Sequence, residues 1–374
     1  MRMLVWYWGR RGGGPRYTLE LLRALAERSD IELTVSLSSA NETLDDFSAF
    51  GCRRHLVETY SDIRSFLGAS VRLPSIRRDF CSFISTARPD VVVSVMPHPW
   101  SWYLARAVPD AGSRLVSIIH DAYMHPGEVN PLWNWRIRRE LTAADGVVAL
   151  SRHVQQQLVT GYRYPASRIA VIPLGPFAYR CEIEAPRLFP RDRPFRFLFF
   201  GRVLAYKGIR LLLDAYRALA AQRQDVELCI AGGGDLGPYR ALIEGLPRVT
   251  VINRWIEERE IPRLLSHSDA LVASYTEASQ SAAVATAYGS GMPVVVTPVG
   301  GLVEQVVPGE TGLVAAETSG VAVARAMSAI LDPCLYERCA AGARQAAFDG
   351  AGWRLTAELL VEHCRRLPPV AAAC

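Results

Sequence analysis

The feature that most constrains this chain is a pattern of short apolar runs separated by helix-like segments, and the pattern occurs twice. Continuous Val/Ile/Leu runs that alternate with amphipathic helices are typical of a parallel sheet covered by helices on both faces. The sequence therefore predicts an α/β protein with two doubly wound parallel-sheet domains. The runs are MLVWYW, IELTVSL, DVVVSVM, RLVSIIH, GVVALS and IAVIPLG in the first half, then FRFLFFGR, VELCIAGGG, VTVINRW, ALVASY, PVVVTP and TGLVAA.

A polar, proline-bearing stretch without periodicity separates the two halves and is typical of a linker. We predict a first domain over residues 1–178, a linker over 179–194 and a second domain over 195–350. An amphipathic helix over 351–367 and a short tail over 368–374 complete the chain. Two such domains facing one another would form a cleft. Ligands of open α/β sheets bind at the carboxyl ends of the strands.

Composition excludes several classes of protein. No apolar run approaches the roughly 18 to 20 residues that cross a bilayer, and the N-terminus lacks the pattern of a secretory signal, so we expect a cytoplasmic protein. The eight cysteines have no zinc-site spacing, and no D-x-D pair or histidine cluster occurs, so no obligatory metal is expected. Nucleic-acid binding would require a larger excess of positive charge and a reader motif.

The formal charge of +5 is unevenly distributed, because the whole excess falls within residues 1–175. This asymmetry suggests an anionic partner for the first half. In that half VNPLWNWRIRRELT sets Trp133 and Trp135 beside three arginines, Arg136, Arg138 and Arg139. Tryptophan next to arginine suits a lipid–water interface. A helix with solvated arginines on one face and tryptophans in the core explains the same sequence pattern, and both interpretations stay open.

Lys207 is the only lysine among 42 basic residues, and an ammonium on a flexible stem is chemically unlike a planar guanidinium. It follows the apolar run FLFF, which ends at Gly201 and Arg202. Arg202 and Lys207 are thus predicted near the carboxyl end of one strand, where both could contact an anion together with the N–H groups of the next helix. The alternative is a loop with two solvated cations. The lone lysine at this place favours the anion site.

The stretch ASYTEASQSAAVATAYGSG also lies between two apolar runs. Glu277 and Ser281 fall in the predicted turn, where Glu277 could accept hydrogen bonds from sugar hydroxyls and backbone N–H groups near Ser281 could bind phosphate. Alternatively, Ser279 or Ser281 is an ordinary helix cap and Glu277 a favourable charge near the helix dipole. This stretch alone does not decide between the two.

Two further candidates lie in the first half. The glycines Gly12, Gly13 and Gly14 follow the first strand but do not match G-x-G-x-x-G, so they permit close approach to a ligand or form a mobile turn. His120 and Asp121 end the run RLVSIIH. His120 could donate to a sugar hydroxyl or a leaving phosphate, or it could be a structural histidine.

With these residues identified, the chain resembles the retaining glycosyltransferases of the GT-B fold, family four (group 1). The resemblance covers nearly the whole length. It rests chiefly on FGRVLAYKGIRLLLDAY, AGGGDLGPYRALI and ASYTEASQSAAVATAYGSGMPVVVTPVGGLVEQVVPGETGLV in combination. It implies an N-terminal acceptor-binding domain, a C-terminal nucleotide-sugar-binding domain, both Rossmann-like, and a final helix that crosses back to the first domain.

The resemblance also implies a role for each candidate residue. Arg202 and Lys207 would neutralise the donor diphosphate, His120 would touch the donor sugar, and Glu277 would bind sugar hydroxyls. A front-face mechanism is implied, in which the leaving phosphate accepts the acceptor's proton. The remaining donor-binding residues would be Gly13 and Gly14 of the glycine loop, Gly201, the backbone near Trp255 and Ile256 for the base, Gln280 and Ser281 for the phosphates, and Thr286.

One position departs from the family pattern. The family commonly has two glutamates separated by seven residues, and the second binds ribose. Here Thr286 stands at the second position, and Glu277 lies one residue earlier than the first requires. The ribose contact is therefore in question, whereas the phosphate side is unaffected.

The resemblance implies a UDP- or GDP-linked sugar as donor, without an obligatory metal. The acceptor would be a glycan, a lipid-linked intermediate of cell-surface polysaccharide or glycolipid synthesis, or a small natural product. Contact with the inner face of the membrane through the first domain would suit a lipid-linked acceptor. The rivals are an inverting transferase or a nucleotide-sugar epimerase, with Asp121 or Glu128 as base, and a homologue that binds a nucleotide without turnover.

Overall fold

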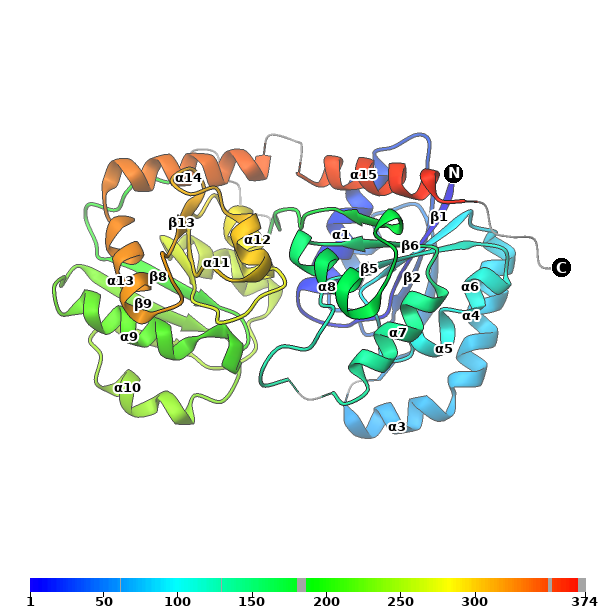
Figure 1. Cartoon of the computed structure of the whole chain (residues 1–374), viewed down its shortest axis with the longest axis horizontal. Helices are drawn as coiled ribbons and strands as arrows, with labels where there is room; N and C mark the ends of the chain where they lie inside the picture. Colours follow the sequence, from blue (N-terminus) through cyan, green and yellow to red (C-terminus); the bar gives the residue numbers. More distant parts are fainter. Residues whose placement is uncertain (61, 129, 180–185, 349–351, 369–374) are drawn as a thin grey trace. The chain divides into compact units, whose positions relative to one another are not determined.

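The computed structural model describes residues 1–60, 62–128, 130–179, 186–348 and 352–368, and the chain divides into two compact units (Figure 1). Neither unit is one continuous segment. Met124–Val129, which lies within the range predicted for the first domain, belongs to unit 2. Unit 1 comprises Met1–Tyr123, Asn130–Pro173 and the chain from Trp353 onward, and unit 2 comprises Met124–Val129 and Leu174–Gly352.

In unit 1 the described residues form a sheet of seven parallel strands in the order β3-β2-β1-β4-β5-β6-β7. The chain runs outward from β1 in one direction and then returns to run outward from β4 in the other. Adjacent strands that begin separate runs create a switch point in the topology, here between β1 and β4. The strands are β1 (Arg2–Tyr7), β2 (Glu32–Ser38), β3 (Arg53–Val57), β4 (Val91–Val95), β5 (Arg114–Ile119), β6 (Gly146–Ala149) and β7 (Ile169–Val171).

Helices flank this sheet. One core cluster joins the apolar faces of α4, α6, α7 and α8 to sheet residues such as Trp6, Val92 and Leu115, so these helices cover one face. The connection from β1 to β2 runs across the sheet in the opposite direction. A right-handed crossover in that direction places its helix, α1, on the other face of the sheet. The helices are α1 (Gly13–Ala26), α2 (Leu44–Phe47), α3 (Ile63–Val71), α4 (Leu73–Ala87), α5 (Ser101–Leu104), α6 (Ala107–Asp110), α7 (Trp133–Ala143), α8 (Arg152–Tyr162), η1 (Ala166–Arg168) and α15 (Gly352–Arg366).

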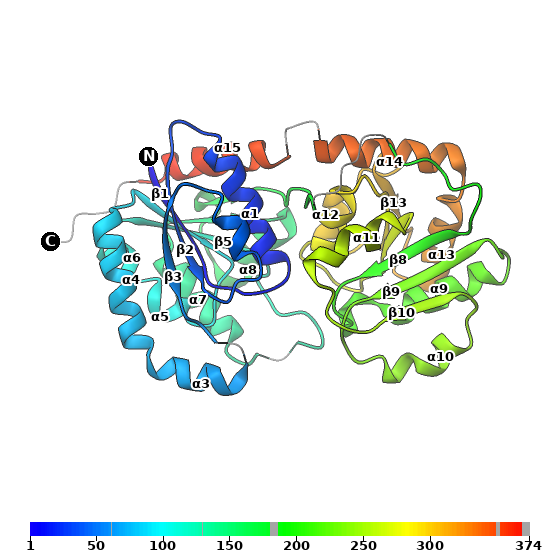
Figure 2. The ribbon, with the colours of Figure 1, turned by 180° about the vertical axis from the view of Figure 1, so that it is seen from behind.

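The last helix, α15, packs on unit 1, as both ribbon views show (Figures 1 and 2). Arg354 bonds Glu27 at 2.9 Å, and Arg365 bonds Asp30 at 2.6 Å. Arg114 donates to two carbonyl oxygens near the end of the helix, those of Cys364 and Leu367. Helix α15 is therefore fixed to the unit that residues 1–123 begin.

In unit 2 the described residues form a six-stranded parallel sheet in the order β10-β9-β8-β11-β12-β13, with its switch point between β8 and β11. All six apolar runs predicted for the second half are strands. They are β8 (Phe195–Phe200), β9 (Val226–Ala231), β10 (Val249–Ile252), β11 (Ala270–Ala273), β12 (Val294–Val296) and β13 (Gly312–Val314).

The core of unit 2 packs α9, α13 and α14 against alternate residues of β8, namely Phe195, Phe197 and Phe199. The predicted helix after Lys207 is α9, and the one after Ser281 is α12. The helices are η2 (Ala205–Lys207), α9 (Ile209–Ala220), η3 (Gly237–Tyr239), α10 (Arg240–Glu244), η4 (Glu258–Glu260), α11 (Ile261–Ser266), α12 (Ala282–Tyr288), η5 (Gly300–Gln305), α13 (Gly320–Ala329) and α14 (Pro333–Phe348).

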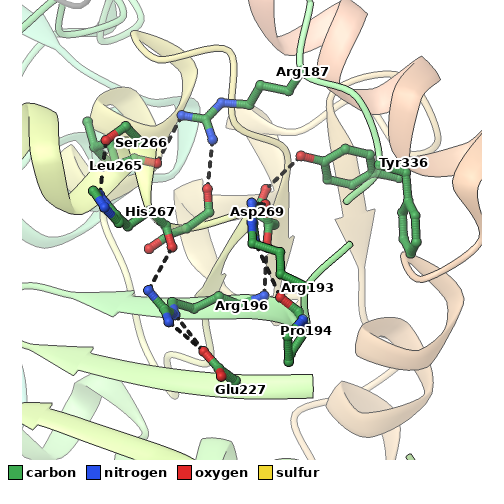
Figure 3. A network of polar contacts seen from close by, with 12 residues as sticks. Arg187, Arg193, Pro194, Arg196, Glu227, Leu265, Ser266, His267, Asp269 and Tyr336 are labelled. Carbon is green, nitrogen blue, oxygen red and sulfur yellow. Dashed lines mark hydrogen bonds and ion pairs between the residues drawn. The ribbon is translucent and has the colours of Figure 1, made fainter. Parts of the chain in front are cut away.

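The stretch predicted as a linker is bound to unit 2 by arginines (Figure 3). Arg193 makes two hydrogen bonds of 2.7 Å to the buried carboxylate of Asp269. Arg187 donates to the carbonyl oxygens of Leu265, Ser268 and Ser290. These bidentate and multiple bonds hold residues 187–193 against the amino-end edge of the sheet. Residues 180–185 of the predicted linker and 369–374 of the predicted tail lie outside the described residues.

Candidate functional site

The two stretches singled out in the second half meet at the switch point of the unit 2 sheet. Arg202 and Lys207 follow β8, and Glu277 to Ser281 follow β11, the strand that pairs with β8. Because parallel strands present their carboxyl ends at one edge, the two loops lie side by side there. This is the edge where open α/β sheets bind ligands.

Backbone contacts lock the two loops together. The N–H of Thr276 donates to the carbonyl oxygen of Tyr206 at 2.8 Å, and the Ser274 hydroxyl donates to that of Gly208 at 3.0 Å. Gly208 has a φ of +65°, and a Cβ at this position would lie 1.9 Å from the Ser274 oxygen. Only glycine fits here, so the K-G pair is required by the close approach of the β11 loop.

Lys207 is held between aromatic rings. Its Nζ lies 3.9 Å from the ring centroid of Tyr275 and 5.0 Å from that of Tyr206. Burial acts to lower the pKa of Lys207, but Tyr275 and Tyr206 raise it by more, so the net pKa lies above the ordinary lysine value. The site therefore keeps a full positive charge at neutral pH. Aromatic faces orient such a cation without neutralising it.

Arg202 is placed differently from Lys207. Its side chain is exposed and donates to Glu128 at 2.8 Å. Within the part of the chain that the structure describes, Arg202 and Lys207 have different partners, Glu128 for the first and the two tyrosine rings for the second. Gly201, just before it, has a φ of +127°, and its carbonyl oxygen is so close to Gly232 that a Cβ there would lie at 1.9 Å. The glycines thus bring the loops after β8 and β9 together.

Glu277 is contacted by a residue that the sequence did not single out. Its Oε1 lies 3.3 Å from Nδ1 of His125, in the segment Met124–Val129 that belongs to unit 2. The buried His125 ring stacks on Tyr206, with centroids 4.3 Å apart and planes at 23°. The same short segment also carries Glu128, the partner of Arg202. It therefore links both candidate loops.

The turn before α12 is partly engaged by the protein itself. Ser281 is the N-cap of α12, and its hydroxyl accepts the Val284 N–H at 3.3 Å. The Ser281 N–H donates to Oε1 of Gln305 at 2.6 Å, so that particular N–H is not available to phosphate in this structure. Thr286 is buried inside α12, with 2% of its surface exposed.

Other groups in this turn have no internal partner. The buried Oε1 of Gln280 has no hydrogen-bond partner among the described residues. Across the same described ranges, the backbone N–H groups of Glu277, Ala278 and Gln280 donate to no acceptor. The turn therefore presents several unused donors and one unused acceptor beside Lys207.

Trp255 and Ile256 follow β10. Trp255 is 40% exposed, whereas Ile256 is buried and lines a cavity of about 660 Å³. The cavity lies between the sheet and α11 and carries several basic side chains on its wall. Its lining includes Arg196, Arg254, Arg259, Glu260, Arg263 and His267.

In unit 1 the glycine loop is shorter than the sequence suggests, because Gly13 and Gly14 already form the first turn of α1. A Cβ at Gly14 would lie 2.1 Å from the Tyr7 hydroxyl oxygen, and one at Gly9 would lie equally close. Packing around Tyr7 thus explains these two glycines. The role of Gly13 in donor binding remains a prediction.

His120 follows β5 and is paired with its neighbour, since its Nδ1 lies 2.9 Å from Oδ2 of Asp121. Asp121 and Glu128, the bases considered for a rival mechanism, are therefore both engaged, Glu128 by Arg202. Among the residues that the structure describes, no group of three or more His, Cys, Asp or Glu side chains is arranged to hold a metal ion. Over the same residues, no helix has the length and apolarity of a transmembrane span.

Family models match both halves of the chain. The family described as "Glycosyltransferase Family 4" matches residues 11–175. The family described as "Glycosyl transferases group 1" matches residues 194–333. Together the two matches cover most of the chain, one in each unit.

Individual relatives agree with these matches. A glycogen synthase of Mycobacterium tuberculosis is 27% identical over 72% of this chain and 67% of its own length. A D-inositol 3-phosphate glycosyltransferase of Xylanimonas cellulosilytica is 28% identical over 95% of this chain and 91% of its own. The structure of Anabaena HepE in complex with UDP-glucose has a TM-score of 0.73 at 17% identity, and the match covers 98% of this chain and 100% of that one.

The sequence matches and the fold point the same way. Two parallel-sheet α/β units of seven and six strands, each with one switch point, are the architecture of the GT-B fold. The two family models fall on these two units in order. The chain belongs to the family four, group 1 glycosyltransferases of the GT-B fold.

Proposed function

We propose that this glycosyltransferase moves a sugar from a nucleoside diphosphate to a hydroxyl acceptor with retention of anomeric configuration. The observation that carries the proposal is the placement of Lys207. The only lysine of the chain stands at the switch point between β8 and β11, on the ring of Tyr275. An ammonium fixed there matches the negative charge of a diphosphate.

The β11 turn supplies the rest of the phosphate site. The N–H groups of Glu277, Ala278 and Gln280, unused among the described residues, lie on the same edge as Lys207. Backbone donors fixed in advance need no rearrangement as charge develops on the leaving phosphate, and such electrostatic stabilisation is usually the largest part of catalysis. The unpartnered Oε1 of Gln280 suits a donor hydroxyl, and it offers a ribose contact in place of the missing glutamate at Thr286.

In the reaction, the acceptor oxygen bonds to the anomeric carbon while the bond from that carbon to the phosphate oxygen breaks. The acceptor proton passes to the leaving phosphate on the same face of the sugar. Lys207 stabilises the nucleoside diphosphate that leaves, and Glu277 holds sugar hydroxyls. Arg202 joins the phosphate site by exchanging its partner Glu128 for the donor, and His120 touches the donor sugar.

The nucleotide is proposed to be UDP or GDP. HepE, which shares the fold over nearly its whole length, was crystallised with UDP-glucose. In this chain the base would lie against the backbone near Trp255 and Ile256, and Gly13 would approach the donor from the first helix. No obligatory metal is proposed, because Lys207 and backbone N–H groups supply the positive potential that a divalent cation otherwise provides.

A lipid-linked or polysaccharide acceptor, and contact with the inner face of a membrane, suit the surface of unit 1. Leu67 is 65% exposed, Val71 81% and Leu132 58%, and Trp135 is 43% exposed beside Arg139. Exposed leucine and tryptophan with adjacent arginine are typical of segments that bind a lipid interface. Sedimentation with vesicles containing anionic phospholipid tests this contact, and a Leu67→Ser, Trp135→Ser protein should remain in the supernatant.

The function is tested by release of nucleotide from UDP- and GDP-sugars, with and without glycan, lipid-linked and small-molecule acceptors. We expect acceptor-dependent release, and a product whose anomeric configuration by NMR matches that of the donor. An inverted product, or an epimerised sugar formed without acceptor, would identify the rival enzyme classes. Nucleotide binding without any turnover would identify a degenerate homologue.

A further inference from the structure

Unit 1 contains a second cluster of basic and polar groups, at the carboxyl edge of its own sheet. Arg10 follows β1 and His98 follows β4, the two strands that flank the switch point. Arg10 lies over the ring of Tyr60 at 5.3 Å, and that ring lies 5.6 Å from the ring of His98. Arg136 lies on α7, which packs against α5, and the Ser101 hydroxyl at the start of α5 accepts the His98 N–H at 2.8 Å. The charge of Arg136 acts on both Tyr60 and His98.

The state of Arg136 is unusual for a cation. Its residue is 9% exposed, and its Nε is buried without a hydrogen-bond partner in the described ranges. The guanidinium lies 5.8 Å from the Trp133 ring, and over the same ranges it forms no ion pair. Glu140, one helical turn away, instead accepts a hydrogen bond of 2.8 Å from Ser117. Within the described part of the chain, Glu140 acts on Arg136 through its charge but forms no ion pair with it. A buried cation held in this way is costly to keep, and an anionic ligand would offset that cost.

The neighbours of Arg136 are neutral donors. Burial, with the charges of Arg136 and Arg10, lowers the pKa of His98 to about 3, so its ring is neutral at pH 7. Because its Nδ1 accepts the Trp100 N–H at 3.3 Å, the ring proton is assigned to Nε2, which can donate. The Tyr60 hydroxyl makes no hydrogen bond within the described part of the chain. Glu42, the other carboxylate of this region, accepts the Gly12 N–H at 2.7 Å.

We propose that Arg10, Arg136, Tyr60 and His98 bind an anionic group, phosphate or carboxylate, that is carried by the acceptor. This inference rests on the proposed function, because it assigns the acceptor to unit 1. Two guanidinium groups and two neutral donors offer more hydrogen bonds than the two oxygens of a carboxylate can accept. The three terminal oxygens of a phosphate monoester match them better. The Tyr60 ring, which is only partly buried, gives the sugar ring that carries the anion an apolar surface.

The test is calorimetric titration of the full chain, in saturating UDP, with glucose 6-phosphate, glucuronate, inorganic phosphate and glucose. We expect glucose 6-phosphate to bind at least tenfold more tightly than glucose. Arg136→Gln and Arg10→Gln should each remove this preference. Tighter binding of glucuronate than of the phosphate would identify a carboxylate as the recognised group. Equal affinity for charged and neutral sugars, or an unchanged preference in the Arg10→Gln protein, would overturn the proposal.

Two controls separate this site from the donor site. Arg138→Gln changes an exposed arginine two residues along α7 and should leave the anion preference intact. Lys207→Ala should also leave it intact, because Lys207 belongs to unit 2. If the anion preference is absent while nucleotide sugars are still turned over, only the acceptor inference fails. If anions bind but no sugar is transferred to any acceptor, the proposed function fails. Should Arg136→Gln not fold, the part-buried Arg10→Gln decides the outcome.

Discussion

The Nζ of Lys207 lies 3.9 Å from the ring centroid of Tyr275, so the charge is positioned by an aromatic face and not by an acidic side chain. An ion pair in this position would already satisfy the ammonium. A ring leaves the charge available to an incoming anion while it restrains the flexible stem. We interpret this contact as the preorganised part of the donor site.

Lys207→Ala is expected to lower kcat/KM for nucleotide-sugar turnover about 100-fold or more, the usual effect of removing one electrostatic group from a transition-state site. Lys207→Arg should recover only part of the loss, because a longer, planar guanidinium spreads the charge that the compact ammonium concentrates at one point beside Tyr275. Arg210→Ala is the matched control, since Arg210 is exposed and paired with Asp214 on the first turn of α9. Steady-state kinetics measure all three. A Lys207→Ala enzyme with wild-type turnover would contradict the mechanism.

His125 is predicted to position both Tyr206 and Glu277. His125→Phe retains a ring stacked on Tyr206 but loses the contact with Glu277. The His125→Phe change should therefore lower kcat/KM strongly for the natural donor sugar. It should lower kcat/KM less for deoxy or epimeric donor sugars, which lack the hydroxyl that Glu277 binds. His125→Ala removes both contacts and should raise KM for the donor further. Equal KM values for all three proteins would show that the segment does not support the site.

Stability is predicted to fall as the pH falls below about 6.5, because of His98. Its folded-state pKa is about 3, whereas an unfolded histidine titrates near 6.5. The unfolded state therefore binds a proton that the native state refuses. The contribution of neutral His98 to the free energy of unfolding is complete above pH 6.5. It falls by up to about 1.4 kcal/mol per pH unit as the pH falls towards 3. Urea unfolding of wild type and His98→Asn at several pH values measures it. The exposed His267→Asn is the control, and parallel curves for wild type and His98→Asn would contradict the assignment.

Gly208→Ala should destabilise unit 2 by roughly 2 to 3 kcal/mol, because the new Cβ meets the Ser274 carbonyl oxygen and φ is positive. Donor binding should weaken at the same time, since the two loops would move apart. Gly68→Ala, in the exposed helix α3 with no atom within 4 Å of the added Cβ, should instead stabilise by up to about 1 kcal/mol. Chemical denaturation distinguishes the two, and similar effects at both positions would refute the packing argument.

The strands of unit 2 could be predicted because both faces of the sheet are covered, so each strand is a continuous apolar run. The strand β3 was not predicted, because its sequence RRHLV lies at the edge of the unit 1 sheet and is largely exposed. An edge strand forms because it pairs with its neighbouring strand, and its own residues need not form an apolar run. The start of α1 at Gly13 could not be predicted, since the packing of Gly14 on Tyr7 is a tertiary contact that periodicity does not reveal.

For the site, the sequence correctly located Lys207 and the β11 turn at the carboxyl-end edge of the unit 2 sheet, because strand ends can be located from apolar runs. The aromatic partners of Lys207 had a weak signal: Tyr206 is its neighbour in the sequence, and Tyr275 ends the predicted strand ALVASY. His125 and Gln305 had none. They reach the turn through segments 152 and 24 residues away along the chain, and such contacts depend on the folded path of the backbone.

The interleaving of the two units bears on how the chain folds during synthesis. Unit 1 lacks α15 until residues 352–366 have left the ribosome, although its strands are made first. Unit 2 can complete its sheet earlier, with Met124–Val129 already available upstream. Domains usually fold in the order in which they emerge, yet here the first to emerge is the last to be finished. A nascent chain arrested before residue 352 should therefore have a protease-resistant second half and an incompletely protected first half.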